Sequence, residues 1–345
     1  MTAMGQMRAA VLVEPGKFVI EQRAIPPPKP DEVLIKVERA GICGTDLHIF
    51  HGHYAADKLP LVPGHEFVGV VAGTGAEASR FTEGQRVVVD INVGCGSCFW
   101  CRRNEILSCP EMQQLGITMD GAFAEYIAVP SRLVIPVPED MPADVAALTE
   151  PVACVVRAAR KSKVGLGQSV VVLGAGPIGN LHIQLMRLVG AAPIIVMELS
   201  ELRAEMARAA GADAVVTDPA KLHETVLAMT AGRGADVVIE SVGAPALYAE
   251  AFKLIRRGGH VAFFGITGPG ASVPVDIVQT ILREDSLKGS VAGMGEDMHD
   301  ALTLLAHGRF ATERFTEASF ALSDIQQAFD SVPQRPQHLK TQIVF

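Results

Sequence analysis

The stretch from Cys43 to Glu66 contains residue types that bind metal ions and transfer protons. Cys43 opens the run Cys-Gly-Thr-Asp-Leu-His, and His65 and Glu66 follow within 23 residues. Thiolate, imidazole and carboxylate are ligand types of a zinc ion that keeps one coordination position open for chemistry. Thr45 and His48 lie two and five residues after the thiol, where a hydroxyl and an imidazole can carry a proton away. The stretch therefore predicts half of a catalytic zinc site.

A second set of thiols indicates a structural metal site. Cys95, Cys98 and Cys101 are spaced Cys-x-x-Cys-x-x-Cys, and Cys109 follows eight residues later. Four thiolates at this spacing can surround one tetrahedral zinc ion in a loop that has no core of its own. A full thiolate set leaves no open position, so we expect a structural role. An iron–sulfur cluster is the competing interpretation, because it also uses Cys-x-x-Cys-x-x-Cys.

Composition limits the class of protein that carries these residues. The chain has 345 residues, enough for two domains, with 49 % hydrophobic and 20 % charged residues. A net charge of −8 and a pI near 5.7 argue against a nucleic-acid partner. Met1–Met7 has no apolar core of signal-peptide length, and six cysteines in such a chain favour metal binding over disulfides. We therefore expect a cytoplasmic protein with neither a nucleic-acid nor a membrane partner.

Short apolar runs dominate the first 150 residues. Gly16 and the proline-rich segment at 26–30 separate them as turns and loops do. This pattern of short apolar segments separated by glycine and proline predicts a small β-barrel or sandwich-like domain with little helix. We place that domain at residues 1–150. The expected strands are Ala9–Val13, Phe18–Ile20, Val33–Val37, Phe67–Val71, Arg86–Ile91, Phe123–Val129 and Leu133–Val137.

A glycine-rich turn follows a buried strand in the second part of the chain. Ser169–Leu173 reads as the strand, and Gly174-Ala175-Gly176-Pro177-Ile178-Gly179, the glycine turn, leads into a helix that ends near Gly190. In this context the glycines let the backbone approach a pyrophosphate, whose charge the helix N-terminus stabilises. The uncharged stretch Val164–Met186 is long enough to span a bilayer. Its glycines, Pro177 and polar residues fit the strand, turn and helix better.

An acidic residue after the next strand bears on the choice of dinucleotide. Glu198 follows the strand 194–197 and lies nineteen residues after Gly179. A carboxylate at this distance accepts the ribose hydroxyls of NAD and repels the 2′-phosphate of NADP, so we favour NAD. Arg203 complicates this prediction, and we expect it to stack on the adenine side.

Strands and helices continue to alternate up to Val291. Expected strands at Ala214–Val216, Asp236–Ile239, Val261–Phe264 and Leu287–Val291 complete a set of six, the number in a doubly wound Rossmann sheet. We therefore place a dinucleotide-binding domain at residues 151–291, after which residues 292–345 return to the first domain through a helix and a final strand. The residues expected to contact the cofactor, besides the glycine turn, are Glu198, Arg203, Ser241, Val242, Phe264, Gly265, Ile266, Ser290 and Val291.

From Met7 to Phe345 the chain resembles the zinc-dependent medium-chain alcohol dehydrogenase superfamily. Gly64-His65-Glu66, the four-cysteine segment and the glycine turn occur in the family's order. The resemblance implies an α/β protein, with a GroES-like β-barrel catalytic domain and a Rossmann domain. It also implies a catalytic zinc, a structural zinc, NAD as cofactor with NADP as the less favoured choice, and a homodimer or homotetramer.

The pair Glu150-Pro151 is similar to the Glu-Pro of polyol, 2,3-butanediol and threonine dehydrogenases. Simple alcohol dehydrogenases of the family supply a cysteine near this position instead. The resemblance makes Cys43, His65, Glu66 and Glu150 the candidate zinc ligands, with either glutamate as the direct one. Thr45, His48, Glu66 and Glu150 are then the candidate catalytic residues. At the end of the last expected Rossmann strand, sorbitol dehydrogenases carry Phe-Arg-Tyr and threonine dehydrogenases carry Gly-Arg. This chain has Val291-Ala292-Gly293 there instead.

The activity that the resemblance implies is hydride transfer between NAD and a secondary alcohol: a polyol, a sugar alcohol or a vicinal diol. Thr45 accepts the hydroxyl proton and His48 passes it to solvent. An L-threonine 3-dehydrogenase is the alternative, and a non-catalytic NAD-binding relative is a more distant one. A zinc-free enone reductase of the same fold would lack Cys43, His65 and the four cysteines, which are all present.

Overall fold

The computed structural model describes residues 5–268 and 270–345. Residues 1–4, part of the segment searched for an export signal, lie outside these ranges. The chain divides into two units, of which the first comprises Met1–Ala153, Gly293–His307 and Thr312–Phe345. The second comprises Cys154–Ala292 and Gly308–Ala311. Each unit has its own sheets and core and is described separately.

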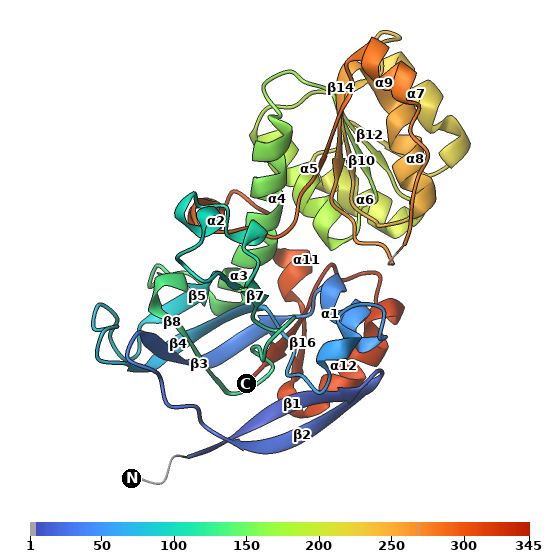
Figure 1. The fold of residues 1–345 in the computed structure, drawn as a ribbon. Helices are drawn as coiled ribbons and strands as arrows, with labels where there is room; N and C mark the ends of the chain where they lie inside the picture. The colour runs from blue at the N-terminus through green and yellow to red at the C-terminus, as the bar shows by residue number, and fades with distance from the viewer. Residues whose placement is uncertain (1–4, 269) are drawn as a thin grey trace. The chain divides into compact units, whose positions relative to one another are not determined.

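A mixed sheet forms the frame of the first unit. Its strands run in the order β16-β17-β3-β4-β5-β9, and β8 pairs with β3 on one side. A β1–β2 hairpin lies next to this sheet (Figure 1), and Ala10 N–H donates to the carbonyl oxygen of Phe123. The strand expected at Phe123–Val129 therefore begins later, at Tyr126, because Phe123 bonds to the hairpin. The strands are β1 Gln6–Glu14, β2 Lys17–Ala24, β3 Glu32–Gly41, β4 Glu66–Thr74, β5 Arg86–Val89, β6 Asn92–Val93, β7 Gln113–Gln114, β8 Tyr126–Pro130, β9 Val134–Pro136, β16 Ala318–Ala321 and β17 Thr341–Val344.

The register at the end of β3 brings distant parts of the chain together. Gly41 pairs with Glu66, the first residue of β4, and on its other side with Gln342 of β17. Cys43 follows β3 by two residues, and Lys340 precedes β17 by one. Residues 43, 65–66 and 340 are thus adjacent although they span most of the chain.

The first unit also contains helices, most of which are short. The sequence predicted little helix here, yet α1 (Gly44–Phe50) starts directly after Cys43. Cys43 and Asp46 have the spacing of a capping box, in which the residue at the third helical position bonds back to the N-cap, and this signal could have predicted α1. The other helices are α2 Phe99–Arg102, α3 Ala143–Ala146, α10 Glu296–Ala306, α11 Glu313–Thr316 and α12 Ile325–Ser331, and α4 (Thr149–Ser162) runs from the first unit into the second.

In the described residues of the second unit, six parallel strands form one sheet with the order β12-β11-β10-β13-β14-β15. In chain order this is 3-2-1-4-5-6, the doubly wound arrangement predicted from the sequence. Helices α5 and α6 lie on one side of this sheet, and α7 and α8 on the other (Figure 1). The elements are β10 Val170–Leu173, α5 Pro177–Leu188, β11 Ile194–Met197, α6 Glu201–Ala210, β12 Ala214–Val216, α7 Leu222–Met229, β13 Ala235–Glu240, α8 Pro245–Leu254, β14 Ile255–Phe263, α9 Ile277–Arg283 and β15 Ser286–Gly289.

The uncharged stretch Val164–Met186 contains β10, the glycine turn and the first part of α5. A strand, a turn and part of a helix do not make one continuous span. Among the described residues, no helix combines the length and apolar character needed to cross a bilayer.

Candidate active site and cofactor site

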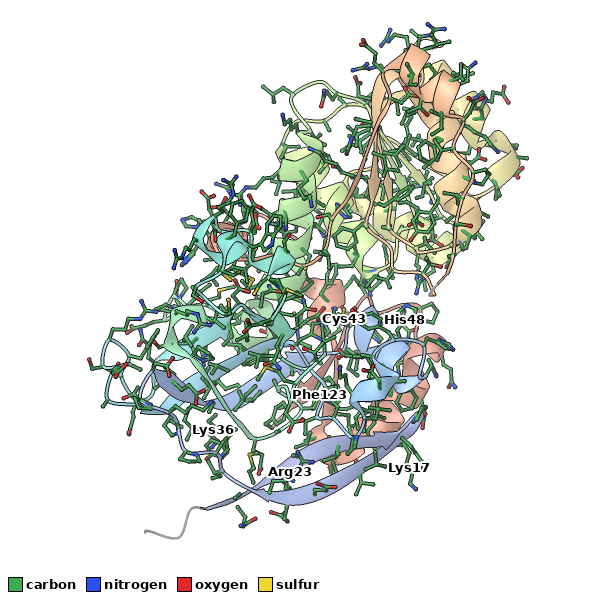
Figure 2. The ribbon with its side chains drawn as sticks, in the orientation of Figure 1. Lys17, Arg23, Lys36, Cys43, His48 and Phe123 are labelled. Carbon is green, nitrogen blue, oxygen red and sulfur yellow. The ribbon has the colours of Figure 1, made fainter. Side chains whose placement is uncertain are left out.

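Three potential metal ligands converge where α1, β3 and β4 meet. The ligand atoms of Cys43, His65 and Glu66 all lie within 4.8 Å of one another, and we call these residues the metal cluster. His65 and Glu66 are buried, whereas Cys43 is half-buried at the start of α1. Figure 2 shows Cys43 and His48 close to α1 in the first unit. A thiol, an imidazole and a carboxylate at this separation form a donor set that fits zinc.

Asp46 holds the backbone and the imidazole of this cluster in place. Its carboxylate is fully buried and accepts the N–H of Cys43 at 2.8 Å and that of Gly64 at 3.3 Å. Asp46 Oδ1 also lies 3.2 Å from His65 Nδ1, although the angle is not that of a well-formed hydrogen bond. Carboxylates of this kind orient a ligating histidine and select its tautomer.

The electrostatics at this point favour a positive charge. Burial opposes protonation of His65, but the charges of Asp46 and Cys43 raise its pKa well above the ordinary value. A buried imidazole gains a proton only where neighbouring anions compensate the lost hydration. The metal cluster therefore fits a cation as well as a zinc-type donor set.

Lys340 is the buried counter-charge of Glu66. Its Nζ donates to both carboxylate oxygens of Glu66 at 2.7 Å, and both side chains are buried. Burial opposes the charge of Lys340, but Glu66, Cys43 and Glu150 raise its pKa. The nearby backbone leaves no spare space, because a Cβ added at Gly41 would lie 2.3 Å from Glu66 Oε2.

The remaining predicted catalytic residues lie on two helices. Thr45 and His48 are half-buried on α1, three residues apart and so on one face of that helix. Burial lowers the pKa of His48, and the nearby His53 and His51 lower it further. Glu150 is buried in the first turn of α4. It is outside the three-residue metal cluster, although its charge acts on Lys340.

The four thiols of the cysteine lobe, residues 95–109, also converge. Their sulfur atoms all lie within 4.8 Å of one another, and Cys95 Sγ is 4.0 Å from Cys101 Sγ. All four are free thiols. Main-chain N–H groups of Ser97 and Cys98 lower the pKa of Cys95 to about 6. A thiolate is thus favoured at Cys95, whereas burial raises the pKa of Cys101 to about 12, so that a metal would have to displace the proton of Cys101.

The glycine turn has the shape of a pyrophosphate cradle. Gly174 has φ +94°, a left-handed conformation that favours glycine, and a Cβ added at Gly179 would lie 2.0 Å from the carbonyl oxygen of Gly174. Around Gly176, the N-cap of α5, the nearest described atom beyond the adjacent residues is Arg203 Nη1, 3.9 Å from an added Cβ. The first glycine makes the turn, the second leaves the backbone open to a ligand and the third packs helix against strand. Pro177 and Ile178 follow, half-buried at the start of α5.

Glu198 holds this turn from the end of β11. Its Oε2 accepts the N–H of Ala175 at 2.8 Å, and its Oε1 accepts that of Ser200 at 2.9 Å. Each oxygen retains a lone pair that can accept a further hydroxyl. Arg203, on α6, lies beside Gly176, and its Nε is buried without a partner in the described part of the chain.

The other predicted cofactor residues lie after β13, β14 and β15. Ser241 Oγ donates to the carbonyl oxygens of Leu173 and Gly174, so this hydroxyl holds the glycine turn. Val242 and Ile266 expose large apolar side chains, as does Val291. Ser290 N–H donates to the carbonyl oxygen of Phe263. Phe264 packs against the His182 ring, and Gly265 meets the loop after β13.

Sequence reasoning did not single out two buried charged residues. Lys340 lies 274 residues from its partner Glu66 and has no local motif. Glu240 ends β13 directly before the Ser241–Gly243 loop, and its position after a buried strand was an available signal.

Two family models match this architecture. Residues 29–139 match the alcohol dehydrogenase GroES-like domain, and residues 177–307 match the zinc-binding dehydrogenase model. The first unit is therefore the GroES-like domain and the sheet of the second is the Rossmann domain, as the sequence resemblance implied.

Curated relatives align along nearly the whole chain. An L-threonine 3-dehydrogenase of Mesorhizobium japonicum is 32% identical, over 92% of this chain and 93% of the relative. A sorbitol dehydrogenase of Bacillus subtilis is also 32% identical, over 96% of this chain and 95% of the relative. A solved zinc-binding dehydrogenase from Sinorhizobium meliloti bound to NADP has 30% identity and a TM-score of 0.89, covering 99% of this chain and 100% of the other.

Identity at this level over this length is not produced by a shared fold alone. At 92% and 96% of this chain, the matches extend through both units. The chain therefore belongs to the zinc-dependent medium-chain alcohol dehydrogenase family, as an oxidoreductase that acts on CH–OH donors with zinc and a nicotinamide cofactor.

Proposed function

We propose that this protein oxidises a secondary alcohol that carries a neighbouring hydroxyl group, a polyol, sugar alcohol or vicinal diol, with NAD as acceptor. The convergence of Cys43, His65 and Glu66 within 4.8 Å carries this proposal. A second carboxylate, Glu150, is buried at the start of α4. This carboxylate offers a neighbouring hydroxyl group an acceptor that a simple alcohol does not need.

We assign Cys43, His65 and Glu150 as the residues that hold the catalytic zinc. The assignment of Glu150 rests on Lys340, which occupies both oxygens of Glu66. A metal on Glu66 would share each oxygen with the ammonium group of Lys340 and place two cations side by side, which weakens binding there. When bound, zinc supplies a positive charge that lowers the pKa of an alcohol hydroxyl. Cys43→Ala and His65→Ala are expected to abolish turnover while NAD still binds.

Thr45 and His48 provide the proton path in this proposal. They lie on one face of α1, and His48 is partly exposed at its end of the helix. Because its pKa is below the ordinary value, His48 is neutral at pH 7 and can accept a proton. Thr45 donates and accepts through a single hydroxyl, which suits it to pass the proton on.

NAD is the preferred cofactor in this proposal, with NADP as the second choice. Glu198 supports NAD, since its carboxylate lies after the second strand and repels a 2′-phosphate. Arg203 and the NADP bound to the Sinorhizobium relative favour the second choice. Titration of the protein with each dinucleotide tests the preference. Tighter binding of NADP than NAD contradicts it.

The cysteine lobe holds a second, structural zinc ion in this proposal. The four converging thiols support it. Cys101→Ser is expected to reduce zinc content from two ions to one per chain and to make residues 95–109 sensitive to limited proteolysis. Iron in place of zinc in the purified protein indicates the iron–sulfur alternative instead.

Substrate class is tested by NADH formation with the zinc-loaded protein on 2,3-butanediol, xylitol, sorbitol, arabitol, galactitol and L-threonine. We expect turnover on a diol or polyol that a chelator abolishes. Turnover on L-threonine alone favours the second candidate, an L-threonine 3-dehydrogenase, which the 32% identity to such an enzyme supports. A zinc-loaded protein that binds NAD and oxidises none of these compounds contradicts the substrate class.

A homodimer or homotetramer is the expected assembly. Ile277, Val278, Ile281 and Leu282 of α9 are each 64–68% exposed, and the adjacent β15 is exposed at the end of the sheet order. Contiguous apolar surface next to the outer edge of a terminal strand is typical of an interface. Ile281→Lys is expected to lower the sedimentation coefficient, whereas Leu166→Lys, on a separate exposed loop residue, leaves it unchanged.

We place the protein in the cytoplasm. The support is its thiol chemistry: the four cysteines of the cysteine lobe converge as thiols and form no disulfide with one another. Such a site is maintained in a reducing compartment.

A further inference from the structure

Glu240 is a buried carboxylate at the centre of the Rossmann sheet. It is the last residue of β13, is fully buried, and lies opposite Leu173, the last residue of β10, in the parallel register. In a sheet of order 3-2-1-4-5-6, the ends of strands 1 and 4 flank the crevice in which a dinucleotide binds. Glu240 therefore stands at the switch point, on the half of the sheet that receives the second nucleotide.

The carboxylate is bonded to the loop that follows β13. Glu240 Oε1 accepts the N–H groups of Val242 and Gly243 at 3.0 and 2.9 Å, and Oε2 accepts Gly243 N–H at 3.1 Å. Burial raises the pKa of Glu240, and the bonds from Gly243 and Val242 limit that rise. Main-chain donors of this kind favour the ionised form of a carboxyl group.

The same carboxylate is connected to the loop after β14. A Cβ added at Gly265 would lie 2.6 Å from Glu240 Oε2 and 2.1 Å from Gly243 N, so the two loops touch through their backbones. The hydroxyl of Tyr248, on α8, donates to the carbonyl oxygen of Gly265. Burial and the adjacent charge of Glu240 raise the pKa of Tyr248 to about 12, so the hydroxyl remains a donor.

We propose that Glu240 is a positioning residue whose negative charge makes the cofactor site favour the oxidised, cationic nicotinamide over the reduced, neutral one. This inference rests on the proposed NAD-dependent function and adds a residue to it. Glu240 fixes the loops that carry Val242 and Ile266, and it is a buried charge on that half of the sheet. Tyr248 is an uncharged support of the loop after β14, through the carbonyl oxygen of Gly265.

The charge of Glu240 and its positioning of the loops affect the affinities for NAD+ and NADH differently. NAD+ carries a positive charge on its nicotinamide ring, which NADH has lost, and both share all other groups. A purely structural support therefore affects both cofactors equally, whereas a buried carboxylate stabilises only the cation. At the effective dielectric constant of a protein site, one such charge changes the ratio of the two affinities by about threefold to tenfold.

The test is to measure the dissociation constants of NAD+ and NADH by calorimetry or fluorescence, with the zinc-loaded protein and without substrate. Glu240→Gln keeps the size and one acceptor oxygen of the side chain but removes its charge. It is expected to weaken NAD+ binding about threefold to tenfold more than NADH binding. Tyr248→Phe is the matched control, and it is expected to weaken both cofactors by the same factor. Glu240→Ser is a second neutral variant if the glutamine variant does not fold.

An unchanged ratio of the two dissociation constants in folded neutral variants overturns the inference, even if both cofactors bind more weakly. A larger effect on NADH also overturns it. Failure of the wild-type protein to bind either cofactor contradicts the proposed function itself, and the two failures are thereby distinguished.

Discussion

Lys340 and Glu66 form a buried ion pair in which one ammonium group donates to both carboxylate oxygens at 2.7 Å. Both side chains are buried, with exposed fractions of 3% for Lys340 and 0% for Glu66. The pair keeps Glu66 beside Cys43 and His65 but occupied. Lys340 is therefore the direct hydrogen-bond partner of Glu66, and Glu150 also acts on its charge.

Removal of Lys340 is expected to be strongly destabilising. Lys340→Met leaves the buried charge of Glu66 without its partner, which costs about 3–5 kcal/mol. The measurement is the midpoint of urea unfolding of the first unit, with zinc present throughout. Lys340→Arg retains the charge and serves as the comparison. A methionine variant as stable as the arginine variant shows that the pair does not support the site.

Gly41 is expected to be intolerant of alanine for a steric reason. The new Cβ would lie 2.3 Å from Glu66 Oε2, so the carboxylate must move away from Lys340. We expect Gly41→Ala to lower the free energy of unfolding by about 1–3 kcal/mol. Gly44→Ala is the matched control, because an added Cβ there meets nothing within 4 Å. Equal thermal melting of the two variants contradicts the crowding at Gly41.

Asp46 is expected to control zinc affinity without being a ligand. Asp46→Asn weakens the acceptor for Cys43 N–H and Gly64 N–H and removes the charge beside His65. Loss of such an orienting carboxylate lowers metal affinity by about 10- to 100-fold. Competition with a coloured chelator measures this directly. Asp57→Asn, at an exposed aspartate paired with Lys58, provides the control. Retained zinc affinity in Asp46→Asn disproves its orienting role.

His182 is expected to make the second unit sensitive to acid. Its ring is fully buried on α5, neither nitrogen has a partner in the described part of the chain, and burial lowers its pKa to about 3. The folded state thus holds His182 neutral, whereas the unfolded chain binds a proton below about pH 6.5. As pH falls from there toward 3, this residue costs about 1.4 kcal/mol of stability per pH unit.

Replacement of His182 by leucine should remove this acid-dependent loss of stability. We expect His182→Leu to raise stability at neutral pH, because two unpaired nitrogens leave the core, and to flatten the loss of stability between pH 6 and 4. Urea midpoints across that pH range are the measurement. His223→Gln, at an exposed histidine, should behave as wild type. A variant with the same pH slope as wild type shows that His182 is hydrated in the folded state.

The sequence predicted the second unit more fully than the first. Strand–turn–helix order around Gly174–Gly179 and the later alternation determine a doubly wound sheet, because parallel strands need crossover helices. The observed strand order, 3-2-1-4-5-6, is one of the orders that a doubly wound sheet adopts. Glu240 was missed because a buried carboxylate at a strand end has no spacing motif of its own.

In the first unit, motifs identified candidate metal ligands but could not identify the residues that support them. Cys43, His65 and Glu66 are recognisable by residue type and local spacing. Lys340 becomes their neighbour only through the pairing of β3 with both β4 and β17, a register that depends on packing of the whole sheet. Glu150 was predicted from family resemblance, and its role as a ligand stays a prediction.

Glu198 links two properties that evolution would otherwise vary separately. Its carboxylate supports Ala175 N–H in the glycine turn and, in the proposed function, also selects the cofactor. A mutation that exchanges Glu198 for a small or basic residue to admit a 2′-phosphate therefore loosens the turn in the same step. The gain and the loss are coupled, so the substitution is beneficial only in a background that already supports Ala175 by another acceptor. Cofactor preference in this chain is thus epistatic, and the order in which mutations arise decides whether it can change.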